Sequence, residues 1–234
     1  MSTIVKLVSM SQVDAEYAAE VSDGDVAVST LLSLPEGLCA YVARVSSPTQ
    51  TNPEYAKLLK YCMEHGHWSV FEQISITMDV TTSLAIAAQL LRHRSFCFQQ
   101  FSARYAKVPD SYEAFEARSQ DMKNRQASHD DMPQYVKDWW ANVQKNAWET
   151  TFSYYNEAIG RGISKETARA ILPVATTTRL FVSGNLRSYI HYINVRSDIS
   201  TQKEHRDIAN AMKQILILKT PIIAEACGWT SLEV

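Results

Sequence analysis

The chain is organised around residues 84–105, which run Leu84-Ala85-Ile86-Ala87-Ala88-Gln89-Leu90-Leu91-Arg92-His93-Arg94-Ser95-Phe96-Cys97-Phe98-Gln99-Gln100-Phe101-Ser102-Ala103-Arg104-Tyr105. The apolar first part is typical of a helix packed into a core, and Thr81, Thr82 and Ser83 offer N-caps for it. Three arginines and a histidine follow, although a helix dipole favours each cation at its C-terminus by only about 0.3–1 kcal/mol. Arginine is preferred where a planar fork must grip phosphate or carboxylate. The stretch therefore predicts an anion-binding site beside a buried helix.

The composition is that of a globular protein with one sizeable core. Of the 234 residues, 46% are hydrophobic and 21% are charged, and the net charge is −2. This balance argues against a broad nucleic-acid or membrane-surface partner, and no window approaches the ~20 apolar residues of a membrane span. The first residues lack the apolar core of a signal peptide, and the four cysteines stand far apart without a CxxC pair. We therefore expect free thiols and a cytoplasmic location.

The pattern along the chain predicts one helix-rich α+β domain over residues 1–234, with an antiparallel β-sheet. Residues 11–33 are interpreted as a loop with a short helix near 14–20, and the polar residues 109–132 as a mobile excursion. Neither internal repeats nor a Gly/Ser linker divide the chain. Strands are predicted at 3–10, 74–80 and 176–182, with a further strand within 98–108. Helices are predicted at 35–45, 53–65, 84–93, 132–160, 165–172, from 183–185 onward, and at 202–219.

Two further clusters carry polar groups at helical spacing. Arg169 follows Glu166 by three residues, which fits either an intrahelical ion pair or a ligand contact. Asn185 and Arg187 fall in the first turn of a predicted helix, where free N–H groups attract anions. His191 follows Arg187 by four residues, so both share one face of that helix.

Other chemistries fit the sequence less well. His65 and His67 with Glu72 could suggest a metal, but Gly66 interrupts the rigid helical spacing that a zincin needs, so we expect no metal. Cys97 lies near His93 but is flanked by phenylalanines, which favours a structural thiol over an activated nucleophile. The chain contains no G-x-G-x-x-G, P-loop or G-x-S-x-G motif. A nucleotide or flavin must therefore be held without a Rossmann turn.

The spacing of these residues resembles that of flavin-dependent thymidylate synthases. Arg92-His93-Arg94, seven residues and then Ser102 match the R-H-R-x7-S signature of that family. The similarity covers about residues 35–226 in the correct order. It includes Arg104-Tyr105, the upstream His67-x-Ser69-x-x-Glu72, and the downstream Arg169, Asn185-x-Arg187 and Arg196.

The resemblance implies a methyltransferase that converts dUMP to dTMP in nucleotide biosynthesis. Its carbon would come from methylenetetrahydrofolate and its reducing equivalents from NADPH through FAD. The family forms intertwined homotetramers whose active sites are shared between subunits. Carried over residue by residue, the FAD-binding residues are Ser69, Arg92, His93, Arg94, Gln100, Asn185, Leu186, Arg187 and His191. The dUMP-binding residues are Gln89, Leu90, Leu91, Arg92, Gln100, Phe101, Ser102, Ala103, Arg104, Arg169 and Arg196.

Arg196 is the residue to which the resemblance assigns catalysis. Uracil C5 must become electron-rich before it attacks a one-carbon electrophile, which requires negative charge on N3 and its neighbouring oxygens. A fixed guanidinium against the ring stabilises that charge by preorganised electrostatics. Because no base is evident to activate Ser102, this serine is interpreted as a hydrogen-bonding group of the pocket.

Three positions depart from the family pattern, and one alternative function stays open. Gln100 stands where many members carry Glu, Gln73 where His is common, and His191 where Asn is frequent. All three can still form hydrogen bonds, so we expect altered affinities and retained activity. The alternative is a nucleotide- or RNA-binding module in which Phe96, Phe98 and Phe101 stack on bases between the arginines.

Overall fold

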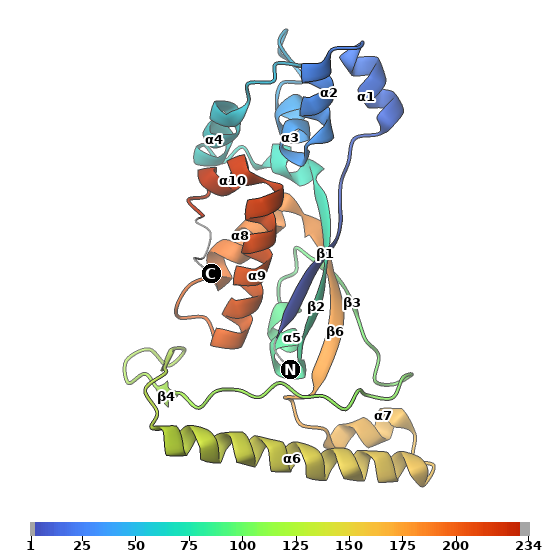
Figure 1. Ribbon diagram of the computed structural model, residues 1–234, viewed down its shortest axis with the longest axis vertical. Coiled ribbons are helices and arrows are strands. Elements are labelled where there is room, and N and C mark those ends of the chain that lie inside the picture. The colour runs from blue at the N-terminus through green and yellow to red at the C-terminus, as the bar shows by residue number, and fades with distance from the viewer. Residues whose placement is uncertain (1–2, 230–234) are drawn as a thin grey trace.

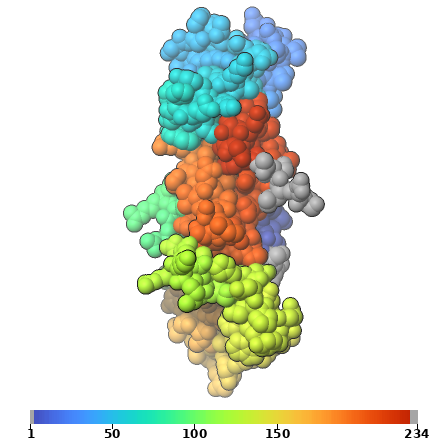
Figure 2. Space-filling model, turned by 90° about the vertical axis from the view of Figure 1, so that its left-hand side faces the viewer, coloured from blue at the N-terminus to red at the C-terminus, as the bar shows by residue number. Residues whose placement is uncertain are grey.

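The computed structural model describes residues 3–229 as an elongated molecule (Figures 1 and 2). The ends of the domain predicted over 1–234, residues 1–2 and 230–234, lie outside the described residues. A twisted sheet occupies the middle of the long axis, with one group of helices at one end and a long helix across the other (Figure 1). The mixed helices and antiparallel strands agree with the predicted α+β class.

The central sheet has four strands in the order β1-β2-β6-β3 and is antiparallel throughout. The strands are β1 (Ile4–Met10), β2 (Ser75–Ser83), β6 (Thr177–Asn185) and β3 (Cys97–Gln100). Met78 lies opposite Val182, and Val80 lies opposite Leu180. All four side chains are fully buried, because the alternation of each strand turns them to the same face.

The opposite face of the sheet is polar along the same two strands. Asp79 pairs with Arg179 through two hydrogen bonds of 2.9 and 2.7 Å, and Thr77 donates to Ser183. Because each strand alternates, the register that buries Met78 and Val80 places these polar groups on the other side.

Three helices cover the apolar face of the sheet. These are α5 (Leu84–Leu90), α8 (Leu186–Arg196) and α9 (Lys203–Lys219). Ser83 caps α5 as predicted, but the helix ends at Leu90 and is followed by turns, so the predicted end at His93 is wrong. Likewise, Asn185 caps α8, while Ser183 and Gly184 belong to strand β6 instead of opening the helix. The core between these layers includes Tyr189, Ile193, Ile208 and Met212.

Helices α1 (Ala15–Ser22), α2 (Val26–Ser33), α3 (Pro35–Ala43) and α4 (Ala56–Glu64) gather at one end with the 3-10 segment η1 (Trp68–Gln73). The loop predicted over 11–33 thus contains a second helix, which Asp25 caps through the N–H groups of Ala27 and Val28. The unpredicted helix α10 (Pro221–Ala226) begins at Pro221, because proline fits the first turn of a helix as well as the residue after one.

A buried carboxyl joins α3 to α10. The Glu36 side chain is only 3% exposed and accepts a hydrogen bond of 2.6 Å from the Ile223 N–H. Burial raises the pKa of this carboxyl to about 7, against the lowering effect of its backbone hydrogen bonds. Glu36 is therefore a buried titratable group far from the sheet.

At the other end, α6 (Gln134–Gly160) crosses beneath the sheet with α7 (Lys165–Ala168) and the 3-10 segment η2 (Arg169–Ile171) (Figure 1). Only Trp148 and Tyr155 of α6 are buried, and Tyr155 joins Val108 and Ala168 in a second, small apolar cluster.

The polar segment 109–132 is more ordered than predicted. It contains a hairpin of β4 (Ser119–Gln120) and β5 (Ser128–His129). The buried Glu113 accepts hydrogen bonds from Thr82 and from the Ser83 N–H, and Gln144 bonds both the N–H and the C=O of Phe115. The segment predicted as a mobile excursion thus contains a short hairpin, and some of its polar residues pair with distant elements.

Within residues 3–229, no single helix is long and apolar enough to cross a bilayer, although the bent pair Val26–Ser33 and Pro35–Ala43 has the length and composition to do so. Within the same residues, no group of three or more His, Cys, Asp or Glu side chains could hold a metal ion.

Candidate active site

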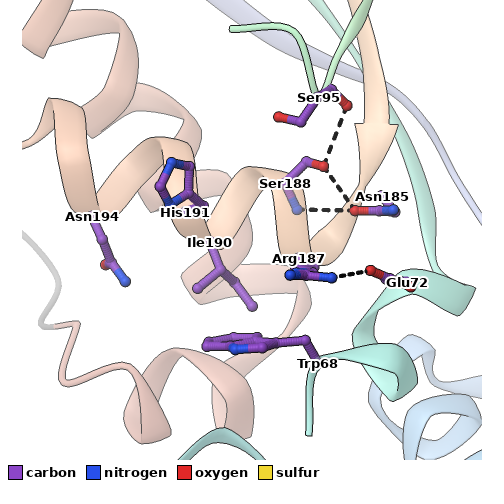
Figure 3. A pocket seen from close by; sticks show the side chains of 9 residues that line it. All are labelled: Trp68, Glu72, Ser95, Asn185, Arg187, Ser188, Ile190, His191 and Asn194. Atoms are coloured by element: carbon purple, nitrogen blue, oxygen red, sulfur yellow. Dashed lines mark hydrogen bonds and ion pairs between the residues drawn. The ribbon is translucent and has the colours of Figure 1, made fainter. Parts of the chain in front are cut away.

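A cavity of about 660 Å³ opens at the start of α8 (Figure 3). Strand β6 ends at this cavity, and Trp68 of η1 forms the wall that faces α8. Arg187 and His191, which the sequence placed on one face of the helix, both line the cavity together with Asn185. The other lining residues are Trp68, Glu72, Ser95, Ser188, Ile190 and Asn194. One apolar wall and several convergent polar groups are typical of a nucleotide or cofactor site.

Hydrogen bonds and an ion pair hold the polar groups of this cavity in place. The Asn185 side chain accepts from the Ser188 N–H at 3.0 Å and caps α8. Ser188 in turn donates to the Ser95 carbonyl at 3.3 Å, which ties the helix to the turn before β3 (Figure 3). Arg187 forms an ion pair with Glu72 across the cavity mouth. The arrangement presents a positive guanidinium and a helix N-terminus to the cavity, both suited to phosphate.

The arginine-rich turn lies between α5 and β3. Arg92 and Arg94 are exposed, whereas His93 is half-buried and turned toward α8. The Arg196 Nε–H donates to His93 Nε2 at 2.9 Å, and the Tyr192 ring stands edge-on to the imidazole at 4.8 Å. Burial, with the nearby Arg196 and His191, lowers the pKa of His93 to about 4. His93 is therefore neutral near pH 7 and fixes the Arg196 guanidinium by accepting from it.

The Gln89 side chain forms hydrogen bonds with two residues at the start of α9. Its Nε2 donates to Gln202 Oε1 at 2.7 Å, and its Oε1 accepts from His205 Nδ1 at 3.2 Å. His205 is fully buried, and burial with the charge of Arg196 lowers its pKa to about 3. Both partners of Gln89 therefore stay uncharged at neutral pH.

A smaller cavity of about 220 Å³ lies at the other end of β6. Four predicted dUMP residues line it, namely Gln100, Phe101, Ala103 and Arg169, together with Leu84, Val108, Leu172, Thr176, Thr177 and Thr178. Gln100 donates to the Thr178 hydroxyl at 3.3 Å. The structure thus brings together residues from both sides of the R-H-R-x7-S motif and from η2.

Glu166 organises the two arginines beside this cavity. Its carboxylate pairs with Arg104 at 3.2 Å, while its backbone carbonyl accepts from the Arg169 Nε–H at 3.4 Å. The intrahelical Glu166–Arg169 side-chain pair considered from sequence is therefore replaced by a longer-range one. Arg104 and Arg169 are both exposed, and both contact Glu166 from different segments of the chain.

The remaining predicted site residues differ in accessibility. Ser69 is exposed on η1, where its carbonyl accepts from Gln73, and Leu91 is exposed after α5. Ser102 is half-buried, and its carbonyl accepts from the N–H groups of the next turn. Leu90 and Leu186 are fully buried in the core and line neither of the two cavities.

The two cavities are not joined within one chain. Asn185 and Thr178 mark their positions on β6, seven residues apart, which corresponds to roughly 23 Å at the usual rise of a strand. The predicted FAD residues Asn185, Arg187 and His191 therefore lie far from the predicted dUMP residues Gln100 and Arg169.

Several lining residues escaped sequence reasoning. Asn194 follows His191 by three residues, so the helical spacing that linked Arg187 to His191 could have included it. Trp68 and Ser95 gave no such signal, because they reach the site from other elements. The structural role expected of Cys97 is also wrong, since this thiol is exposed on the edge strand β3.

Comparisons with known proteins point to one family. The family described as thymidylate synthase complementing protein matches residues 28–222. A flavin-dependent thymidylate synthase of Synechocystis sp. is 53% identical over 195 residues, covering 83% of this chain and 90% of the relative. A probable flavin-dependent thymidylate synthase of Paramecium bursaria Chlorella virus 1 is 50% identical over 196 residues, covering 83% and 91%.

The fold is shared with a solved structure as well. A UMP/dUMP methylase, PolB from Streptomyces cacaoi bound with 5-Br dUMP, superposes with a TM-score of 0.78 at 22% identity, covering 100% of this chain and 98% of that one. At this identity the likeness speaks for the fold alone.

Proposed function

This chain belongs to the flavin-dependent thymidylate synthase family, and we propose that it converts dUMP to dTMP with methylenetetrahydrofolate as carbon donor and NADPH-reduced FAD as hydride source. In that reaction the folate methylene would form a bond to uracil C5 as C5 loses its proton and the bonds from the methylene to the folate nitrogens break. One hydride would complete the methyl group, and the freed nitrogens would take up protons to give tetrahydrofolate. The proposal extends to the site residues carried over from the family pattern, and to a cytoplasmic location, with which the four free thiols agree.

The observation that carries the proposal is the fixed guanidinium of Arg196. Its Nε–H donates a hydrogen bond of 2.9 Å to His93 Nε2, so the two terminal NH₂ groups are left for a ligand. A guanidinium that cannot reorient stabilises charge as it develops on the uracil oxygens and N3. Because His93 stays neutral, it holds Arg196 without adding a competing positive charge.

The donor set around the larger cavity fits FAD. Arg187 and the α8 N-terminus suit its pyrophosphate, while Trp68 and Ile190 offer apolar surface to a ring system. Arg92 and Arg94 are exposed and free of any ion pair among the residues described, so they can add charge from the neighbouring turn. The chemistry supplied by bound FAD is hydride delivery, and the protein side chains orient the reactants and exclude water.

We further propose a homotetramer with sites shared between subunits. The larger cavity, lined by Asn185, and the smaller one, lined by Thr178, lie roughly 23 Å apart along β6 of a single chain. A second copy that places its smaller cavity against the larger one would complete a site of both halves. The departures at Gln100, Gln73 and His191 retain hydrogen-bonding groups, so the proposed activity is kept.

An NADPH oxidation assay with dUMP and methylenetetrahydrofolate tests this function, with dTMP measured as product. We expect purified protein to bind FAD and to form dTMP only when all three substrates are present. Arg196→Ala should abolish dTMP formation while flavin absorbance remains. Arg161→Ala is the matched control, because Arg161 pairs only with Glu157 on the exposed end of α6. Turnover retained by Arg196→Ala would refute the role of this arginine, and a protein that stays colourless with added FAD would refute the function.

A further inference from the structure

A partly buried chain of hydrogen bonds links the β4–β5 hairpin to Gln89. Arg118, just before β4, forms a bidentate pair with Glu204 on α9 at 2.8 and 2.9 Å. The two side chains are only 12% and 7% exposed. Glu204 also accepts from Gln202 Nε2 at 3.0 Å, and Gln202 Oε1 accepts from Gln89 at 2.7 Å. Four side chains thus connect a hairpin to the helix that precedes the arginine-rich turn.

The direction of donation along this chain is set at its first member. A guanidinium can only donate and a carboxylate can only accept, so Glu204 accepts from both of its neighbours. Gln202 must therefore turn its NH₂ toward Glu204 and its oxygen toward Gln89. Gln89 in turn presents its NH₂ to Gln202. The charge-assisted pair at the start makes the reverse orientation costly.

The other side of the Gln89 amide agrees with this orientation. Its oxygen accepts from His205 Nδ1 at 3.2 Å, and the buried His205 Nε2 has no hydrogen-bond partner among the residues described. The histidine is therefore neutral with its proton on Nδ1, as an amide oxygen requires. With its oxygen and one N–H engaged, Gln89 keeps a second N–H whose direction is fixed.

We propose that Arg118, Glu204 and Gln202 are positioning residues that lock the Gln89 amide, so that the 109–132 segment sets the affinity of the site for its pyrimidine nucleotide. This inference rests on the proposed function, in which Gln89 contacts dUMP. The locked N–H is a donor suited to an oxygen acceptor of that nucleotide, and it pays no reorientation entropy on binding. Arg118 also bonds Ser128 on β5 at 3.2 Å, so the hairpin itself holds the first member of the chain.

The test is the substitution Gln202→Met, with dUMP binding measured by calorimetry on the full-length protein. Methionine has a similar size and cuts the chain while leaving the Arg118–Glu204 pair intact. We expect the dissociation constant for dUMP to rise about tenfold, which one hydrogen bond can supply. The turnover at saturating dUMP should change by less than about twofold, since Gln202 does not contact the reacting atoms.

Gln144→Met is the matched control. Gln144 anchors the same segment through the Phe115 backbone but has no bond to Gln89 or its partners. This variant should leave dUMP affinity unchanged. An equal loss of affinity in both variants would mean that any loosening of the segment weakens binding, and it would overturn the positioning role.

A charge swap, Arg118→Glu with Glu204→Arg, separates positioning from simple stability. The swap keeps an ion pair but reverses the donor and acceptor at Gln202, which must then flip its amide. We expect it to recover the melting temperature lost by Arg118→Glu alone and not to recover dUMP affinity. Recovery of both would overturn the proposal, as would normal dUMP binding by Gln202→Met. A wild-type protein that fails to bind dUMP would instead refute the proposed function.

Discussion

Buried histidines should make the stability of this protein depend on pH in a calculable way. The pKa of His93 is lowered from 6.5 to about 4 and that of His205 to about 3, in both cases first by burial. Between pH 5 and 6 the unfolded chain therefore binds nearly two more protons at these sites than the native protein does. Because the unfolded state binds more protons, the free energy of unfolding falls as pH falls through this window.

Glu36 acts in the opposite direction. Its pKa is raised from 4.5 to about 7, so in the same window the native state carries roughly one proton that the unfolded state lacks. The net difference is about one proton, which corresponds to a loss of about 1.4 kcal/mol per pH unit on acidification from pH 6 to 5. Near pH 7 the two effects nearly cancel, and stability should be almost flat.

Urea unfolding at pH 5, 6, 7 and 8, at one fixed protein concentration, measures this slope. The variant Glu36→Gln keeps an acceptor for the Ile223 N–H and removes the opposing titration. Its slope between pH 5 and 6 should roughly double, to about 2.7 kcal/mol per pH unit. The carboxyls with lowered pKa values, such as that of Asp79, titrate below this window. A stability that is flat or rises on acidification from pH 6 to 5 would refute the reasoning.

Two packing predictions concern strand β6 and helix α8. Gly184→Ala would place a Cβ 2.5 Å from Phe96 Cδ1. It should lower the free energy of unfolding by about 1–3 kcal/mol in a urea titration. Gly160→Ala, whose Cβ would meet nothing within 4 Å, is the control and should not lower the free energy of unfolding. Tyr189→Phe removes the hydroxyl that donates to the Val182 carbonyl at 2.7 Å and should cost about 1–2 kcal/mol. Tyr154→Phe, at an exposed position, should change stability by less than about 0.5 kcal/mol, and an equal effect of both tyrosine variants would contradict the hydrogen-bond argument.

Local pattern alone gave most of the secondary structure. Period-two alternation predicted β1 and most of β2, and β-prone residues predicted the first part of β6. Helical spacing predicted α3, α6 and α9 nearly to their ends. One boundary that failed, between β6 and α8, has a clear cause. Ser183 and Gly184 suit the start of a helix, but pairing with Thr77 and Ile76 on β2 keeps them in the sheet. Backbone pairing with a distant strand overrode the local preference.

The candidate site divides in the same way between sequence and tertiary structure. The R-H-R-x7-S spacing and the shared face of Arg187 and His191 can be found in the sequence, because each depends on residues a few positions apart. The hydrogen bond from Arg196 to His93 joins residues far apart in the sequence, and so do the hydrogen bonds that connect Gln89 to Arg118. The residues they join are up to 113 positions apart. Such contacts depend on sheet register and on how α8 and α9 pack over it, which no local period encodes. The stretch at residues 84–105 thus determined which chemistry to expect, and only the packing of distant helices decided which of its side chains are fixed and which stay exposed.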